Sequence, residues 1–122
     1  MKISVKDFEI SKKNEIIDEN GNIKYWCQPD FSYKKRLHVY NLDNNEIGYV
    51  QYKVISLQSD VEYFDAADNK LDYSEYTFVE EKDSNFVVLY DGNKIATVCN
   101  DTFEINDRED ECLLFIFGNI GE

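Results

Sequence analysis

The stretch NLDNNEIGYVQYKVI (residues 41–55) joins a turn to the apolar residues of a strand. Asp, Asn and Gly favour tight turns because they accept backbone conformations that other residues avoid. The residues from Ile47 to Ile55 are rich in Val, Ile and Tyr and partly alternate between apolar and polar, which is typical of a half-buried strand. The stretch therefore predicts a hairpin turn that leads into a β-strand.

The same combination occurs four times along the chain, at a constant spacing of 24 residues. Two series of apolar residues keep this spacing: Ile23, Ile47, Leu71 and Ile95, and eight positions later Phe31, Ile55, Val79 and Phe103. Asn or Gly stands two positions before each member of the first series, where we expect positive φ angles: Gly21, Asn45, Asn69 and Asn93. The spacing predicts hairpin turns near 19–22, 43–46, 66–70 and 91–94.

Strand-forming runs enter the turns at 37–40, 61–64 and 86–90 and leave them at 23–26, 47–55, 71–79 and 95–99, with polar links at 32–35 and 56–59. A period of 24 residues also occurs in leucine-rich repeats. However, the chain lacks the regular leucine and asparagine positions of that repeat, and its turns have hairpin chemistry. We therefore expect a mostly β protein with a closed or nearly closed antiparallel sheet, since closure removes exposed strand edges.

The chain ends on the apolar run CLLFIF (112–117), which predicts either a helix buried on all sides or a last β-strand. Asn106 or Asp107 could cap the helix, and the acidic residues at 109–111 suit the positive end of its dipole. Gly118 or Gly121 could end it. The residues alone leave both alternatives open.

Length and composition indicate a single domain over residues 1–122 that folds around its own core. Acidic residues outnumber basic ones by 25 to 13, and the resulting charge of −12 opposes binding to nucleic acid or anionic lipid. No apolar run reaches the length of a membrane span, and the start of the sequence has no apolar signal-peptide core. We therefore expect a soluble cytoplasmic protein.

Side chains that carry chemistry are few or dispersed. Cys27, Cys99 and Cys112 form no metal-binding pair and are expected to be reduced and partly buried, while His38, the only histidine, is expected to face solvent on a strand. Carboxylates are plentiful, but no spacing singles out a catalytic or calcium-binding set. The sequence thus predicts no catalytic residue, no metal and no cofactor, and we expect a protein that is not an enzyme.

Aromatic residues recur at matching positions of the spacing, with acidic rather than basic residues around them. They are Tyr25, Trp26, Tyr49, Tyr52, Tyr73, Tyr76 and Phe78. A base-stacking surface would need basic residues between its rings. We therefore expect these aromatic side chains in the wall and core of the sheet.

The segments YWCQPDFSYKKRLHVYNLDNNEIGYVQYKVISLQSDVEYFD (25–65), LYDGNKIATV (89–98) and DTFEINDREDECLLFIF (101–117) resemble the tubby-like superfamily, in its LURP-one-related and bacterial small-protein branch. The resemblance covers about residues 20–118. It implies an antiparallel β-barrel of hairpins around a hydrophobic C-terminal helix, which favours the helix for 112–117. The chain departs from the family in length, because it has room for only about nine or ten short strands.

Lys34, Lys35 and Arg36 form one basic cluster, with Lys12, Lys13 and Lys24 expected on neighbouring strands or turns. Because tubby-like domains include phosphoinositide binders, the resemblance makes Lys34, Lys35 and Arg36 candidate binding residues. The alternative is a solvated turn that protects a strand edge, and the overall charge makes anionic lipid an unfavourable partner.

Two functions follow from these observations. The first is a non-catalytic tubby-like barrel that acts as a cytosolic binding or interaction module. The second is an acidic, immunity-type protein that neutralises a basic toxin or nuclease, since complementary charge speeds association. A phosphoinositide-binding or lipid-binding module is a weaker alternative.

Overall fold

The computed structural model describes residues 1–31, 34–55 and 58–120, with side chains described outside 53–60. Eleven strands precede one α-helix. They are β1 (Lys2–Ser4), β2 (Asn14–Asp18), β3 (Ile23–Asp30), β4 (Lys35–Asn41), β5 (Glu46–Ile55), β6 (Gln58–Phe64), β7 (Lys70–Leu71), β8 (Tyr76–Glu80), β9 (Phe86–Tyr90), β10 (Asn93–Cys99), β11 (Thr102–Ile105) and α1 (Glu109–Ile120), with a short 3-10 helix at Lys82–Ser84.

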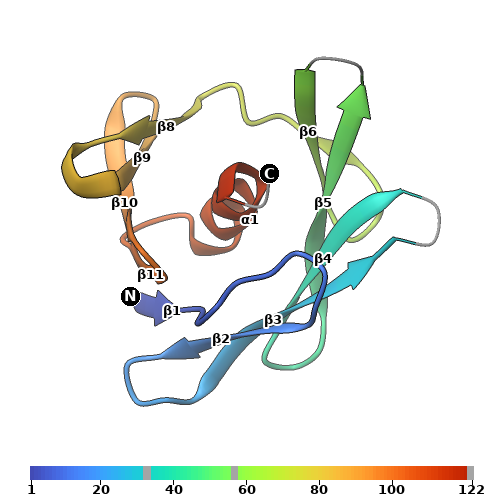
Figure 1. Cartoon of the computed structure of the whole chain (residues 1–122), viewed down its shortest axis with the longest axis horizontal. Coiled ribbons are helices and arrows are strands. Elements are labelled where there is room, and N and C mark those ends of the chain that lie inside the picture. The colour runs from blue at the N-terminus through green and yellow to red at the C-terminus, as the bar shows by residue number, and fades with distance from the viewer. Residues whose placement is uncertain (32–33, 56–57, 121–122) are drawn as a thin grey trace.

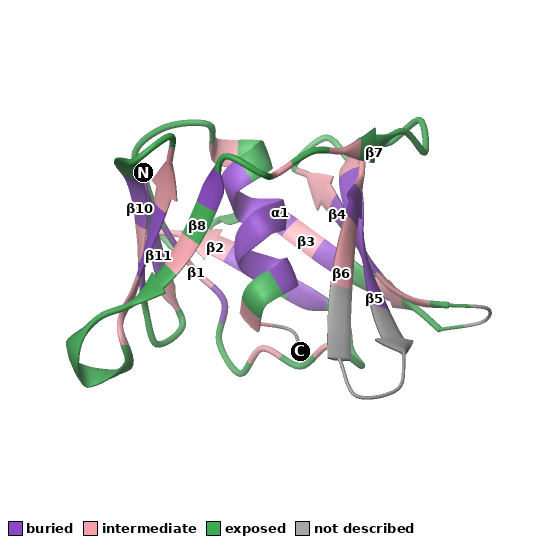
Figure 2. Cartoon of the chain, turned by 90° about the horizontal axis from the view of Figure 1, so that it is seen from above, coloured by how far each residue is buried: buried purple, intermediate pink, exposed green. Residues whose placement is uncertain are grey.

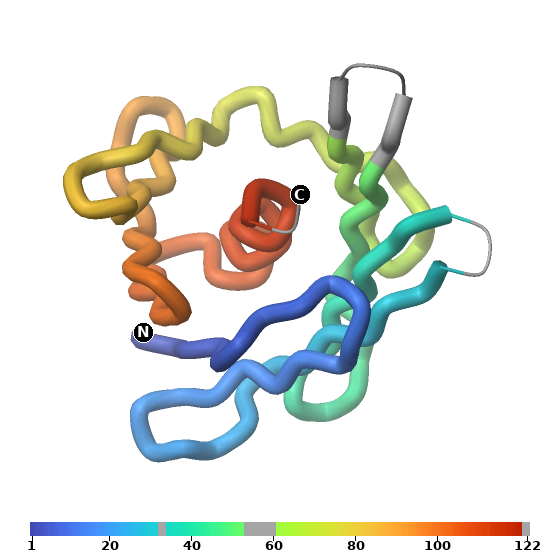
Figure 3. Tube along the Cα trace, in the orientation of Figure 1, coloured from blue at the N-terminus to red at the C-terminus, as the bar shows by residue number. Residues whose placement is uncertain are grey.

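The strands form one antiparallel sheet in the order β7-β6-β5-β4-β3-β2-β1-β11-β10-β9-β8. This sheet curls around α1 (Figure 1), and the first strand, β1, lies beside the last, β11 (Figure 3). The predicted mostly β architecture with a C-terminal helix is therefore confirmed. The sheet is not closed into a barrel, because β7 and β8 remain its two ends. It also has more strands than the nine or ten expected, because several are only two to four residues long.

Tight turns form at or beside the predicted positions, and three of them share one pattern. Their first residues are Asp18, Asn41 and Asp65, and each side chain accepts the backbone N–H groups two and four positions later. In each turn the first N–H also donates to the carbonyl of the fifth residue, over 2.8–2.9 Å. These local bonds explain why the turns could be located from sequence.

The predicted positions of positive φ were correct only at Gly21. In the next two turns the left-handed residue lies one position earlier than expected, at Asn44 and Asp68. In the fourth turn Asp91 and Gly92 both have positive φ, as a two-residue type I′ hairpin requires. The residues expected there, Asn45, Asn69 and Asn93, instead follow the left-handed residue as the chain re-enters its strand.

The apolar run is a helix, and its residues from Cys112 to Gly118 are buried inside the curled sheet (Figure 2). The predicted acidic residues occupy its first turn. The predicted ends were wrong in part: the helix begins at Glu109, after Asn106 and Asp107, and Gly118 lies within it. Gly121 lies outside the described residues. The N–H of Cys112 donates to the Arg108 carbonyl, which makes the first turn of the helix.

The two series spaced by 24 residues do not share a side of the sheet. Ile95 and Phe103 are buried, whereas Ile23, Phe31 and Val79 are exposed; the Ile55 side chain lies outside the described set. The spacing thus follows where the chain turns, not which way its side chains point. Of the aromatic residues expected in the wall and core, Tyr25, Tyr49, Tyr52 and Tyr76 are buried, while Trp26, Tyr73 and Phe78 are half-buried.

The continuous strand expected over 71–79 is broken at residues 72–75, where the sheet opens. The Asp72 carboxylate accepts the Ser74 N–H over 2.9 Å, and the Tyr76 N–H donates to the Tyr73 carbonyl over 3.0 Å. These bonds make a turn and interrupt the strand. We call this junction between β7 and β8, with the link 72–75, the seam.

Candidate functional site

The predicted basic cluster lies at the start of β4, and its side chains do not converge. Arg36 Nε donates to Gln51 Oε1 over 2.9 Å, and its guanidinium lies 5.0 Å from the centre of the Tyr49 ring. Lys35 Nζ lies 5.5 Å from the centre of the Tyr52 ring. Because neighbouring side chains alternate across a strand, Lys35 and Arg36 belong to opposite faces. Lys34 is exposed at the start of this strand, and ligand binding by the three residues stays a prediction.

The other basic residues considered, Lys12, Lys13 and Lys24, do not lie at the start of β4. Lys13 lies just before β2, and its Nζ lies 4.5 Å from the centre of the Trp26 ring on β3. Lys12 is exposed just before β2, and Lys24 is half-buried on β3. No shared anion-binding position follows from these contacts within the described residues.

His38 lies on the outer face of β4, as expected, but its neighbours cover most of its side chain. Its Nδ1 lies 2.5 Å from Glu46 Oε1, its ring centre lies 4.9 Å from that of Tyr49, and its side chain is 19% exposed. The β4–β5 turn brings Glu46 back beside His38, which the local strand pattern could not show. The contact to a carboxylate fixes the ring on the outer side of the sheet.

The three thiols differ in exposure. Cys27 and Cys112 are buried and Cys99 is exposed, and all three are free. The prediction that the thiols are partly buried was therefore wrong, because two of them are buried and the third is exposed. Burial raises the pKa of the Cys112 thiol to about 12, which leaves it protonated and a poor nucleophile at neutral pH.

Within the described residues, no group of three or more His, Cys, Asp and Glu side chains is arranged to hold a metal ion. Over the same residues, no helix is both long enough and apolar enough to cross a membrane.

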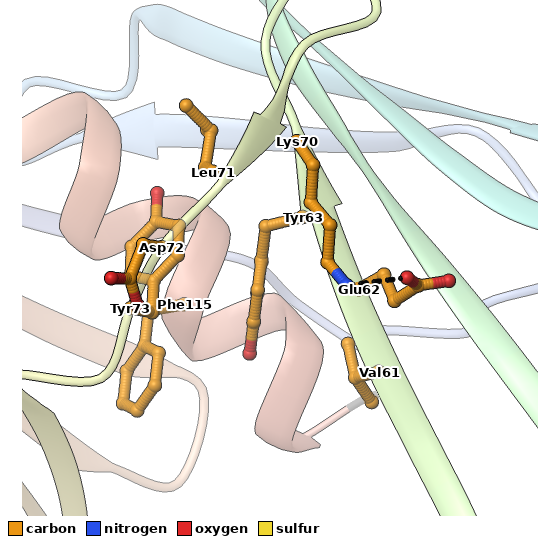
Figure 4. A pocket seen from close by; sticks show the side chains of 8 residues that line it. All are labelled: Val61, Glu62, Tyr63, Lys70, Leu71, Asp72, Tyr73 and Phe115. Carbon is orange, nitrogen blue, oxygen red and sulfur yellow. Dashed lines mark ion pairs between the residues drawn. The ribbon is translucent and has the colours of Figure 1, made fainter.

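The seam contains a cavity of about 480 Å³ (Figure 4). Its lining comes from β6, β7, the link and the helix: Val61, Glu62, Tyr63, Lys70, Leu71, Asp72, Tyr73 and Phe115. At its rim Lys70 Nζ pairs with Glu62 Oε2 over 2.8 Å. The cavity therefore combines aromatic walls with charged groups at its edge, an arrangement that suits a side chain with an apolar stem and a polar end.

Aromatic rings fill the inside of the seam where backbone pairing stops. The Phe115 ring centre lies 5.2–6.4 Å from four others, those of Tyr63, Tyr73, Tyr76 and Phe78. Tyr63 and Tyr73 are closer still, with 4.4 Å between ring centres. These offset and tilted pairs are stabilising beyond the area that they bury, and they join β6, the link and β8 to the helix.

One polar atom in this cluster has no partner. The Tyr73 hydroxyl is buried, and no hydrogen bond to it is found in the part of the chain that the structure describes. Burial, with smaller contributions from neighbouring tyrosines and Glu111, raises the pKa of Tyr73. The hydroxyl is thus neutral and able to donate or accept a hydrogen bond.

The acidic start of α1 is held by tyrosines from two distant strands. The Tyr25 hydroxyl lies within hydrogen-bond distance of the Glu109 and Asp110 carboxylates and donates its single proton to this pair, and the Tyr76 hydroxyl donates to Glu111 Oε2 over 2.7 Å. Arg108 completes the group: its Nη2 pairs with Glu111 over 2.8 Å, and its guanidinium lies 4.0 Å from the centre of the Tyr90 ring. Sequence analysis missed these contacts because the partners lie far apart in the chain.

Formal charge is divided very unevenly along the chain. Residues 72–122 contain thirteen acidic and three basic residues, a net charge of −10, whereas residues 1–71 contain twelve acidic and ten basic residues, a net charge of −2. The strands β8–β11 of the acidic part lie on one side of α1 and β3–β6 on the other (Figure 1). We call the exposed carboxylates of these strands, their connecting loops and the start of α1 the acidic side; they belong to Glu75, Glu80, Glu81, Asp83, Asp91, Asp101, Glu104, Asp107, Asp110 and Glu111.

Comparisons with protein-family models, with curated proteins and with solved structures find no match for this chain. The evidence on its function is therefore its own geometry and charge.

Proposed function

We propose that the chain is a non-catalytic interaction module of the cytoplasm that binds a basic protein through its acidic side. The observation that carries the proposal is the uneven charge: residues 72–122 have a net charge of −10, and the strands β8–β11 of this part lie on one side of α1 (Figure 1). A surface of one sign attracts a partner of the opposite sign and speeds its association, most strongly at low salt.

The rest of the molecule supports the same proposal. The carboxylates of the acidic side are exposed, and two of them, Asp110 and Glu111 at the start of α1, are oriented by Tyr25, Tyr76 and Arg108. The buried thiols and the paired His38 do not form an activated nucleophile with each other. Neutralisation of a basic toxin or nuclease, the immunity-type function, is the specific form of this proposal that the charge favours.

The tubby-like assignment is part of the proposal as well. An antiparallel sheet that curls around a buried apolar helix supports it, and the open seam is the feature in which this chain departs from a closed barrel. Lipid binding through Lys34, Lys35 and Arg36 is the weaker alternative, because Lys35 and Arg36 belong to opposite faces of β4.

Titration calorimetry with a short oligolysine peptide, at low and high salt, tests the proposal. The acidic-side variant Glu81→Gln/Asp83→Asn/Glu104→Gln removes three charges, and the matched control Glu9→Gln/Glu15→Gln/Glu19→Gln removes three exposed charges from the other part. We expect the acidic-side variant to bind about tenfold more weakly at low salt and the control to change about twofold or less. Equal losses in the two variants, or binding that high salt does not weaken, would contradict the proposal.

Co-sedimentation with anionic vesicles tests the lipid alternative. We expect little pelleting at physiological salt, because the overall charge opposes it. Strong pelleting that disappears in Lys34→Ala/Lys35→Ala/Arg36→Ala would restore the lipid function and displace our proposal.

A further inference from the structure

The strand β8 has a free edge beside the seam. It pairs with β9 on one side, and within residues 1–31, 34–55 and 58–120 no strand pairs with its other side. Figure 2 shows α1 between β8 and β6 with no strand in front of it and with the link passing along one end. A free edge offers backbone donors and acceptors to any extended chain that lies along it.

Two hydrogen bonds at the ends of the β8–β9 pair show which backbone groups face the free edge. The Asp91 N–H donates to the Glu75 carbonyl over 2.9 Å, and the Glu81 N–H donates to the Asn85 carbonyl over 2.6 Å. Bonded and non-bonded residues alternate along an antiparallel pair. Phe78 and Glu80 therefore direct their N–H and C=O groups away from β9, towards the seam.

The side chains around this edge favour one kind of occupant. Phe78 contacts the inner aromatic cluster, with 6.4 Å between its ring centre and that of Phe115, while Val79 is 37% exposed on the outer face. The ends of the edge are acidic, with exposed Asp72 and Glu75 on one side and Glu80, Glu81 and Asp83 on the other. A second copy of this chain would bring like charges together, whereas a basic segment would complement them.

The cavity in the seam adds a place for a side chain. An added strand would alternate its side chains between solvent and the seam, and Tyr63, Tyr73 and Phe115 line a volume of about 480 Å³ there.

We propose that the basic partner binds as an added β-strand along the free edge of β8, with one of its inward side chains in the seam cavity. This inference rests on the proposed function and states how the partner is held. The backbone of Phe78 and Glu80 supplies the main-chain hydrogen bonds, and the acidic ends of the edge select lysine or arginine in the added strand.

Amide hydrogen exchange followed by NMR tests the strand addition, with an alternating Lys–Val peptide as the probe. In the free protein we expect fast exchange at Phe78 and Glu80 and slow exchange at Thr77 and Val79, which bond to β9. With saturating peptide we expect exchange at Phe78 and Glu80 to slow about tenfold or more. A peptide of the same sequence with methyl groups on alternate backbone nitrogens keeps its charge, and we expect it to bind about tenfold more weakly.

The outcomes separate this inference from the proposed function. If the peptide binds in a salt-dependent way but leaves exchange at Phe78 and Glu80 unchanged, strand addition is wrong and the acidic interaction module stands. If neither this peptide nor oligolysine binds at low salt, both fail. If exchange at these two amides slows with protein concentration in the absence of peptide, a second copy occupies the edge and the inference is overturned.

A pair of variants at Glu80 gives an independent test. Glu80→Pro removes an N–H that faces the free edge, a position where a strand accepts proline, while Glu80→Gln removes only the charge. We expect Glu80→Pro to bind the alternating peptide about five- to tenfold more weakly than Glu80→Gln. Equal affinity of the two variants would overturn the inference, and should Glu80→Pro fail to fold, the exchange experiment on the unmodified chain decides it.

Discussion

The turn at 65–69 and the link at 72–75 begin with the same chemistry and end differently. At Asp65 the carboxylate accepts the N–H groups of Ala67 and Asn69, and the chain reverses into a paired strand. At Asp72 the carboxylate accepts the Ser74 N–H, whereas the Tyr76 N–H, four positions on, donates to the Tyr73 carbonyl instead. The chain then crosses from one end of the sheet to the other. An Asp-centred turn thus produces a hairpin only where a partner strand is within reach.

The two regions are consequently held together by different forces. Backbone hydrogen bonds join β2 to β6 continuously, whereas the seam depends on aromatic side chains around Phe115. The seam should therefore respond most to changes in packing, and the turns most to changes in their capping side chains.

Phe115→Ala should produce the largest effect. The side chain is 8% exposed and contacts four aromatic rings, so its removal should lower the free energy of unfolding by about 3–5 kcal/mol, measured by urea denaturation. Phe31→Ala is the control, because Phe31 is 47% exposed, and its cost should stay within about 0.5 kcal/mol. Similar costs for the two variants would show that the aromatic cluster does not hold the seam.

Gly118→Ala should produce the next largest effect. A Cβ at this position would overlap the Tyr63 hydroxyl oxygen, so we expect the free energy of unfolding to fall by about 1–3 kcal/mol. Tyr63→Phe removes the nearest atom, and the double variant Gly118→Ala/Tyr63→Phe should lose less than the two single losses added together. A stability gain, which alanine gives at an open helix site, would mean that α1 and β6 are not in close contact.

Low pH should destabilise both the turn at 65–69 and the link at 72–75. Backbone N–H groups, from Asn69 to Asp65 and from Ser74 to Asp72, lower the pKa of both carboxyls below 3.8. A group whose pKa is lower in the folded state stabilises the fold above its unfolded pKa, and this contribution is lost as the pH falls through the folded pKa. Thermal unfolding below about pH 4 should therefore show declining stability.

Substitutions at the same turn position separate this effect from general acid unfolding. Asp65→Asn should flatten the low-pH decline, whereas Asn41→Asp, in the turn whose first residue does not titrate, should steepen it. If both variants keep the slope of the unmodified chain, the capping carboxylates do not determine acid stability.

Tyr73→Phe should have the smallest effect. The hydroxyl is buried without a partner, so its removal should leave the free energy of unfolding within about 0.5 kcal/mol or raise it. Tyr52→Phe is the contrast, because the Tyr52 hydroxyl donates to the Phe117 carbonyl over 2.8 Å and its loss should cost about 0.5–1.5 kcal/mol. A clear destabilisation by Tyr73→Phe would reveal a bond to this hydroxyl in solution.

The turns and the buried helix could be predicted from the sequence, but the candidate site could not. The turns at 18–22 and 65–69 depend on an Asp and the next four residues, so their signal is local. The cavity in the seam is lined by β6, the link and Phe115 of the helix. Because these segments lie about forty to fifty-five residues apart, no local sequence pattern could predict that they meet. Asp72 and Ser74 are residues that favour a turn at 72–75. The 24-residue spacing nevertheless led us to expect a continuous strand over 71–79.

By itself, the sequence determined where the chain turns, that residues 112–117 must be buried, and how unevenly its charge is divided. Each of these follows from the kinds of residue present and their near neighbours. Only the tertiary structure decided that Ile23 is exposed while Ile95 is buried, that Tyr25 holds the acidic start of the helix, and that the sheet stays open at the seam. The physical reason is that strand register and the closure of the sheet depend on packing between residues that are distant in the chain. Such packing produces no periodic pattern in the sequence of any one segment.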